Sequence, residues 1–275
     1  MNKLFTLLML WMLSCLPSLA QAPMDGGVWK DNTGKHINAH GGNIFNYKGT
    51  YYWYGESRSA DGKPYSSLGV SCFTSKDLKK WTNHGLVLPV TDEPGSDIEG
   101  GCIIERPKVL YNKKTKKFVM WFHLELKGRG YGAARYGVAT SDTPFGPFKF
   151  IRSGRVNPGI YPVGFSKPDT TDLKHQLLFP ELKAWWTPEW RKQIERGMFW
   201  MRDFEGGQMS RDMTIFIDDD GKAYHIYSSE DNLTLQIAQL TDDYMQHNGS
   251  YVRVAAGGQN EAPTIFKQDG TYWMI

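Results

Sequence analysis

The chain is poor in cysteine, with 3 in 275 residues, and it lacks the patterns through which cysteine usually acts. Cys15 lies in the N-terminal apolar run, whereas Cys72 and Cys102 have no CxxC spacing and no histidine cluster beside them. A zinc site is therefore not expected. In an oxidising compartment two such cysteines either form a single bridge or stay as buried thiols, and the sequence leaves both open.

The chain also lacks a stripe of charge of one sign. Its 32 Lys and Arg and its 29 Asp and Glu are interspersed and give a net charge of +3. A groove that follows phosphates needs clustered Lys and Arg, so nucleic acid is not an expected partner. After the first twenty residues no apolar run is long enough to span a bilayer, so no transmembrane segment is expected.

The first twenty residues have the pattern of a secretion signal. Lys3 gives a positive start, residues 4–13 are apolar but too few to cross a bilayer, and Ser18-Leu19-Ala20 resembles a cleavage site. We therefore expect a signal peptide at 1–20 and a secreted protein, periplasmic or extracellular. Residues 12–15 loosely resemble a lipoprotein signal in which Cys15 would be acylated, so a lipid anchor is an alternative.

Internal repeats are the main evidence for the fold. Residues 40–54 align without a gap on residues 261–275: both have Ile-Phe four residues in and then Gly-Thr-Tyr at the same offset. Looser copies begin at Glu105 and at Asp212. Each copy is an apolar stretch, a polar turn and an aromatic-rich stretch, and this order predicts a β-hairpin.

A second pair of expected strands follows each of the first three hairpins, at 69–88, 136–150 and 235–254. Four strands per unit of roughly 50 to 60 residues is typical of β-propeller blades. We therefore predict an all-β, five-bladed propeller domain over 21–275. Because the sequence stops inside the second strand of the fourth repeat, we expect the propeller to be truncated here after about three and a half blades.

An insertion at 152–207 separates the second unit from the third. It is rich in proline, glycine and tryptophan, and the stretch around 188–197 has the composition of a short helix. Loops this long on a compact scaffold are often lids or walls of a binding site. A loop packed on the edge of a blade, with no part in function, is the alternative.

Polar residues occupy the same position in all four repeats, at the start of the strand expected to line the central channel. They are His40, Glu105, Asp212 and Glu261. Carboxylates brought together in this way raise one another's pKa, which stability alone does not favour, whereas glycoside hydrolysis requires a proton-donating acid facing a base. Alternatively, some of these acids form ion pairs with Arg106, Lys108 or Arg211.

These motifs resemble glycoside hydrolase family 43, the five-bladed inverting enzymes. The resemblance rests on Glu-x-Pro strands at 105 and 261, on the Ser-x-Asp turn at 75–85, and on the stretch from Arg211 to Lys222. It implies that Glu261 is the general acid and that Asp212 is the residue that sets the acidity of that acid and orients it. The family's usual base is an Asp in the first blade, and this chain has His40 preceded by Asn-Ala there.

The Ala-His-Gly-Gly start at 39–42 and the Tyr-Gly-Glu turn at Glu56 are similar to the exo-β-1,3-galactanase branch of the family. The resemblance implies that a residue of a later blade helps to activate water in this branch. We expect Glu105, His40 and Glu56 to bind substrate. The alternatives are Glu105 as a substitute base, Glu56 as a solvated turn acid, and His40 in a structural hydrogen bond.

The resulting hypothesis is an inverting, exo-acting glycosidase that acts on galactan or arabinogalactan as a monomer, without a cofactor. Some family members hold a central calcium ion, but the acidic run at 218–220 is already explained as turn chemistry, so no metal is expected. Alternatives are an arabinofuranosidase or galactofuranosidase on the same fold, and a carbohydrate-binding propeller without catalysis. Phosphorolysis would need phosphate-binding cations, for which Arg106 and Arg211 are the candidates.

Overall fold

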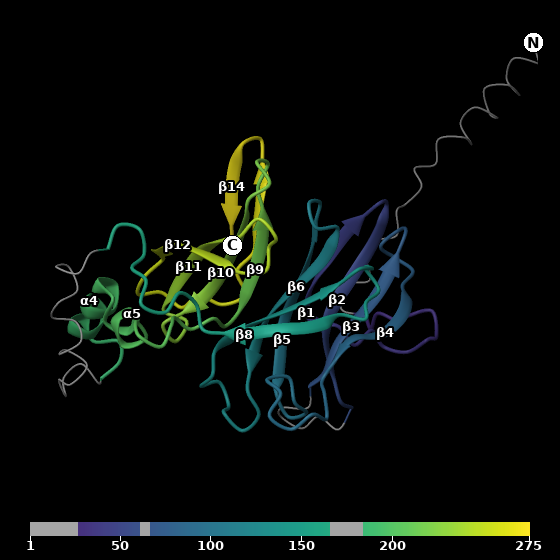
Figure 1. Ribbon diagram of the computed structural model, residues 1–275, viewed down its shortest axis with the longest axis horizontal. Coiled ribbons are helices and arrows are strands. Elements are labelled where there is room, and N and C mark those ends of the chain that lie inside the picture. Colours follow the sequence, from purple (N-terminus) through teal and green to yellow (C-terminus); the bar gives the residue numbers. More distant parts are fainter. Residues whose placement is uncertain (1–26, 61–66, 166–183) are drawn as a thin grey trace, which may run out of the picture.

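The computed structural model describes residues 27–60, 67–165 and 184–275, so the expected signal peptide and Cys15 lie outside the described residues. The regular structure of the described chain is mainly β-strand, in three antiparallel four-stranded sheets and one two-stranded sheet. In each sheet neighbouring strands follow one another along the chain (Figure 1). These sheets are the blades of a β-propeller, as the repeats predicted.

The strands follow the repeat units closely. The first sheet contains β1 (His40–Tyr47), β2 (Thr50–Arg58), β3 (Ser67–Ser75) and β4 (Thr82–Pro89). The second contains β5 (Ile103–Asn112), β6 (Lys117–Glu125), β7 (Arg135–Ser141) and β8 (Lys149–Gly154). The third contains β9 (Met213–Ile217), β10 (Ala223–Ser229), β11 (Thr234–Leu240) and β12 (His247–Val254), and the fourth β13 (Ile265–Gln268) and β14 (Thr271–Met274).

The gapless repeat has a structural basis in its turns. Lys48 and Gly49 between β1 and β2 have φ of 49° and 72°, and Asp269 and Gly270 between β13 and β14 have φ of 50° and 76°. Two successive residues with positive φ make a turn whose twist matches that of the flanking strands. Both hairpins therefore close in two residues, and their strands start in the same phase.

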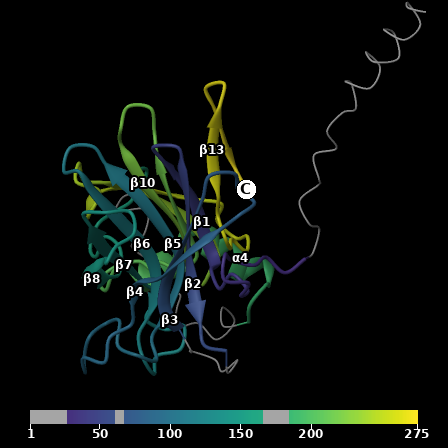
Figure 2. The ribbon, with the colours of Figure 1, turned by 90° about the vertical axis from the view of Figure 1, so that its right-hand side faces the viewer.

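The first strand of each sheet lies nearest to the next sheet. Strand β5 contacts both β1 and β9, and β9 contacts β13. At the outer tips, Lys267 and Tyr272 of the last hairpin contact Asp218 at the tip of the β9–β10 hairpin. Figures 1 and 2 show these two hairpins extending in the same direction. The starts of β1, β5, β9 and β13 are thus brought towards one axis.

Two apolar cores hold the sheets together. The core between the first and second sheets includes Tyr54, Ile104 and Phe122, and it contains both Cys72 and Cys102. The two cysteines are free and buried, so no bridge joins them. Burial raises the pKa of each thiol to about 12, which keeps both protonated and unreactive.

The core between the second and third sheets is built around an aromatic side chain. Trp121 of β6 packs with Met213 and Tyr227 of the third sheet and is fully buried. Its indole N–H donates to the Tyr244 carbonyl at 2.8 Å, which satisfies the one polar group of the ring.

The insertion forms two helices, α4 (Pro188–Arg196) and α5 (Met198–Arg202), so the expected helix around 188–197 is present. Thr187 caps α4, since its hydroxyl accepts from the Trp190 N–H at 3.2 Å. Both helices lie beside the third sheet (Figure 1). Among the described residues no helix has the length and apolar character that a membrane span requires.

Candidate active site

At the starts of two inner strands the pairing is irregular, and this changes the direction of the predicted site residues there. The pairing of β1 with β2 shifts register after His40, and that of β5 with β6 shifts after Glu105. Arg106, inside the second irregularity, has a φ of 53°. Such irregularities redirect side chains at the ends of strands. Asp212 directly precedes β9, and Glu261 lies four residues before β13.

Glu105 lies among donors from three other segments. Its Oε1 accepts from the Tyr131 hydroxyl at 3.0 Å and from Arg58 Nη2 at 3.4 Å, and its Oε2 lies 3.1 Å from His123 Nδ1. Burial by itself raises the pKa of this carboxyl, but the contacts with His123, Tyr131 and Arg58 outweigh burial and lower it. Glu105 is therefore ionised at neutral pH and suited to accept hydrogen bonds from sugar hydroxyls.

His123 and Glu125 form a buried support behind Glu105. His123 Nε2 lies 3.0 Å from Glu125 Oε1, and Glu125 Oε2 accepts from the N–H groups of Ala133 and Ala134 at 2.8 and 2.9 Å. Burial favours neutral His123, yet the bonds to Glu105 and Glu125 raise its pKa above the ordinary value. His123 and Glu125 were not among the predicted site residues, although a His-x-Glu spacing at a strand end places both side chains on one face.

Glu56 lies at the end of β2 and is held by Arg58. Arg58 donates to both Glu56 oxygens, at 2.7 Å from Nε and 3.1 Å from Nη2, and His40 Nδ1 lies 3.1 Å from Oε2. The Glu56 side chain is 2% exposed and that of His40 is 61% exposed. His40 is thus open to a ligand, whereas Glu56 orients Arg58 towards Glu105. A sugar contact by Glu56 stays a prediction.

Asp212 connects the second sheet to the segment that carries Glu261. Its Oδ2 accepts from Arg106 Nη2 at 2.8 Å and from the Ala262 N–H at 3.0 Å. This ion pair with Arg106 is one of the alternatives predicted from the sequence. Because Ala262 directly follows Glu261, Asp212 fixes the backbone on which the expected acid is mounted.

Glu261 itself is exposed, and its Oε1 accepts from Asn232 Nδ2 at 3.0 Å. Arg211 donates instead to the Tyr131 carbonyl and to Asp231. The described residues therefore bring Asp212 to the backbone beside Glu261 and leave the Glu261 carboxyl close to solvent.

One atom from each of three residues could bind a metal ion, and these atoms lie within 4.8 Å of one another. The residues are Glu105, His123 and Asp212. Each of these groups also contacts another charged side chain of the protein: Arg106 is bonded to Asp212, and His123 lies between two carboxylates. A cation here would compete with a guanidinium and with a histidine whose raised pKa favours the imidazolium. The donor set fits an ion-pair network better than a metal site.

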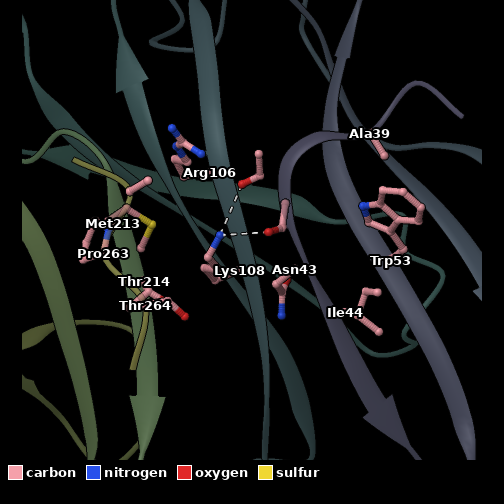
Figure 3. A pocket seen from close by; sticks show the side chains of 13 residues that line it. Ala39, Asn43, Ile44, Trp53, Arg106, Lys108, Met213, Thr214, Pro263 and Thr264 are labelled. Carbon is pink, nitrogen blue, oxygen red and sulfur yellow. Dashed lines mark hydrogen bonds between the residues drawn. The ribbon is translucent and has the colours of Figure 1, made fainter. Parts of the chain in front are cut away.

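A cavity of about 550 Å³ adjoins these groups, and its wall includes the neighbours of three predicted site residues, namely Arg106, Met213 and Ala262 (Figure 3). Lys108 points into it and donates to the carbonyls of Gly41 and Gly42 at 3.3 and 3.2 Å. Burial, with Arg106 nearby, lowers the pKa of Lys108 to about 8. The cavity is large enough for a sugar ring and is bordered by cations as well as by apolar side chains.

No family model matches the chain, and no curated protein sequence does. Solved structures do match. A GH43 β-1,3-galactosidase, solved with galactodeoxynojirimycin, is 58% identical, with a TM-score of 0.84 over 90% of this chain and 71% of that one. The chain belongs to glycoside hydrolase family 43. The predicted family and its propeller fold are thus confirmed.

Other family 43 structures are similar over the same 90% of the chain. An exo-β-1,3-galactanase from Clostridium thermocellum is 35% identical with a TM-score of 0.69, and one from Phanerochaete chrysosporium, solved with β-1,3-galactotriose, is 30% identical with 0.65. The chain spans 44% and 46% of their lengths. An α-L-arabinofuranosidase from C. thermocellum, at 21% identity and a TM-score of 0.51, shares the fold alone.

Proposed function

We propose that the protein removes galactose from the ends of β-1,3-galactan chains by an inverting hydrolysis in which Glu261 is the general acid. The observation that carries this proposal is the pair of hydrogen bonds that Asp212 accepts. One comes from Arg106 of the second sheet and the other from the Ala262 N–H, next to Glu261. The names of the family 43 relatives, a β-1,3-galactosidase and exo-β-1,3-galactanases, support the substrate.

Glu105 and Glu261 have different parts in this mechanism. Glu105 is ionised because His123, Tyr131 and Arg58 surround it, and we assign it to hydroxyl groups of the terminal sugar. Glu261 faces solvent and donates its proton to the leaving oxygen. Water attacks the anomeric carbon from the opposite face of the sugar, and its proton passes to a base about 6.5–9.5 Å from the acid. The family resemblance places that base in a later blade.

Galactose release from β-1,3-galactan, measured with product identification, tests this function. Wild type should release galactose whose first-formed anomer is α, as seen by NMR, and Glu261→Gln should lower kcat by about 10²–10⁴-fold, because general acid catalysis contributes that much. Glu189→Gln, an exposed change on α4, is the matched control and should keep full activity. Release of arabinose instead of galactose would transfer the proposal to an arabinofuranosidase.

A carbohydrate-binding propeller without turnover is the second candidate. It is favoured by His40, which stands where the family resemblance places an Asp base. This candidate predicts that wild type and Glu261→Gln bind β-1,3-galactotriose equally in calorimetry and that neither releases galactose. Retained binding with no release by wild type would therefore refute the hydrolase.

We further propose that the protein is secreted after removal of residues 1–20. The support is the Lys3, apolar run and Ser-Leu-Ala pattern of the leader. Mass spectrometry of the mature protein checks it, since cleavage gives an N-terminus at Gln21, whereas lipidation gives an acylated Cys15.

A further inference from the structure

The turn between β10 and β11 has an unusual backbone. Glu230, Asp231 and Asn232 have φ values of 52°, 58° and 69°, and none of them is glycine. Side chains disfavour this left-handed region, and three such residues in a row persist only where the surroundings hold them. The turn is therefore a feature whose supporting contacts need an explanation.

A buried ion pair holds the first residue of the turn. Glu230 is fully buried, and Arg253 of β12, with its side chain 3% exposed, donates to both of its oxygens. The same guanidinium donates to the backbone carbonyls of Ile194 and Glu195 at the end of α4. The helix of the insertion and the turn are thus fastened to one side chain.

The second residue of the turn is held from the other helix. Asp231 Oδ2 accepts from Arg202 Nη1 of α5 at 2.6 Å, and its Oδ1 accepts from Arg211 Nη2 at 3.3 Å. Arg211 directly precedes Asp212 in the chain. The turn is therefore connected both to the insertion and to the segment of the proposed active site.

The third residue contacts the proposed acid. Asn232 Nδ2 donates to Glu261 Oε1 at 3.0 Å, and the Asn232 carbonyl accepts from the Asn260 N–H at 2.7 Å. The neighbouring carbonyl of Leu233 accepts from the Gly257 N–H at 3.0 Å. The turn thereby holds both the loop that leads to Glu261 and one oxygen of its carboxyl group.

We propose that Asn232 is the positioning residue of Glu261, and that α4 and α5 act in catalysis by holding Asn232 in its left-handed turn. The inference rests on the proposed role of Glu261 as the acid. An oxygen that accepts the Asn232 N–H does not carry the transferable proton, so the proton resides on Oε2 and the carboxyl presents a defined oxygen to the leaving group. The insertion is then a support of the catalytic acid, and not a decoration of the blade edge.

Three variants test this role. Asn232→Gly removes the amide and keeps a residue that favours positive φ, whereas Asn232→Asp keeps the size and turn preference and replaces the donor by an acceptor. We expect each to lower kcat on β-1,3-galactan 10- to 100-fold with KM changed less than twofold, since misplaced catalytic groups lose rate more than binding. Arg202→Met should give a smaller loss of kcat, because Arg211 still holds Asp231.

Lys48→Gly, another change at a positive-φ residue, is the control and should leave kcat unchanged. A structural role for the turn alone predicts a fully active Asn232→Asp. Wild-type kcat in that variant and in Asn232→Gly, with wild-type thermal unfolding, would overturn the proposal and leave the hydrolase standing. If wild type releases no galactose, the proposed function fails, and the contact is still tested by the ¹³C carboxyl resonance of Glu261, which must move in Asn232→Gly.

Discussion

The surroundings of Glu105 and of Glu261 differ in how many charged groups hold each carboxyl. Glu105 contacts Arg58 and His123 as well as the Tyr131 hydroxyl, and His123 is backed by a buried Glu125. Within the described part of the chain, the exposed Glu261 carboxyl accepts from the neutral Asn232 amide. A carboxyl enclosed by cations keeps its charge. This difference fits the proposal that Glu105 binds substrate and that Glu261 is the acid.

We expect the greatest loss, in the free energy of unfolding, from removing the histidine that supports Glu105. His123→Ala leaves Glu105 and the buried Glu125 without the cation between them, and removing one partner of a buried ion pair costs about 3–5 kcal/mol. The free energy of unfolding in urea should fall by that amount. His36→Ala, at an exposed position, is the control. A loss under about 1 kcal/mol would mean that His123 is neutral and that the network is weak.

A smaller loss, in kcat, is expected when Asp212 is changed. Asp212→Asn weakens the bonds to Arg106 and to the Ala262 N–H, and we expect kcat on β-1,3-galactan to fall about 10²-fold, equivalent to about 2.7 kcal/mol of transition-state stabilisation. Asp142→Asn, at a residue whose side chain is 80% exposed, should change nothing. A variant with unchanged kcat and raised KM would show that Asp212 contacts substrate and does not position Glu261.

The smallest effect is the pH dependence of stability. The pKa of His123 is raised above its ordinary 6.5. Its contribution to the free energy of unfolding is therefore complete below about pH 6.5 and is lost as pH rises through the raised pKa. The pKa of Glu105 is lowered below its ordinary 4.5, so its contribution is complete above that pH and is lost as pH falls through the lowered value. Unfolding free energies in urea should therefore be highest between the two limits.

His123→Asn should remove the alkaline decline, whereas His36→Asn should keep it. An alkaline decline that survives in His123→Asn would assign the effect to another group. Lys108 is not that group, although its pKa is lowered to about 8. The lysine case has the opposite sign, because a group with a lowered pKa that loses its charge on burial gains stability as pH rises. A contribution from His123 therefore makes the free energy of unfolding fall as pH rises, whereas one from Lys108 makes it rise.

The strand starts could be predicted because repeats place equivalent residues at equivalent points of the fold. His40, Glu105, Asp212 and Glu261 were found from their phase in the repeats, and the structure places the first three at or beside the starts of inner strands. The helix at 188–197 followed from composition. Both inferences use information that is local in the sequence or repeated along it.

The supporting residues could not be predicted in the same way. His123 and Glu125 lie at the end of a second strand, Arg58 lies at the end of another, and Asn232 lies in a turn without the glycine that marks left-handed backbone. Their roles depend on contacts between sheets, such as that of Asn232 with a glutamate 29 positions away. A single sequence does not rank such pairs, because many polar residues at strand ends have no partner across a propeller.

The two free thiols of the first core can report when the interface between the first and second blades opens. Cys72 and Cys102 are completely buried, and with a pKa of about 12 they stay protonated in the folded protein. A thiol reagent at neutral pH therefore reaches them only when the first and second blades separate. The rate of labelling at these two positions would time the opening of that blade interface, without a probe being introduced into the chain.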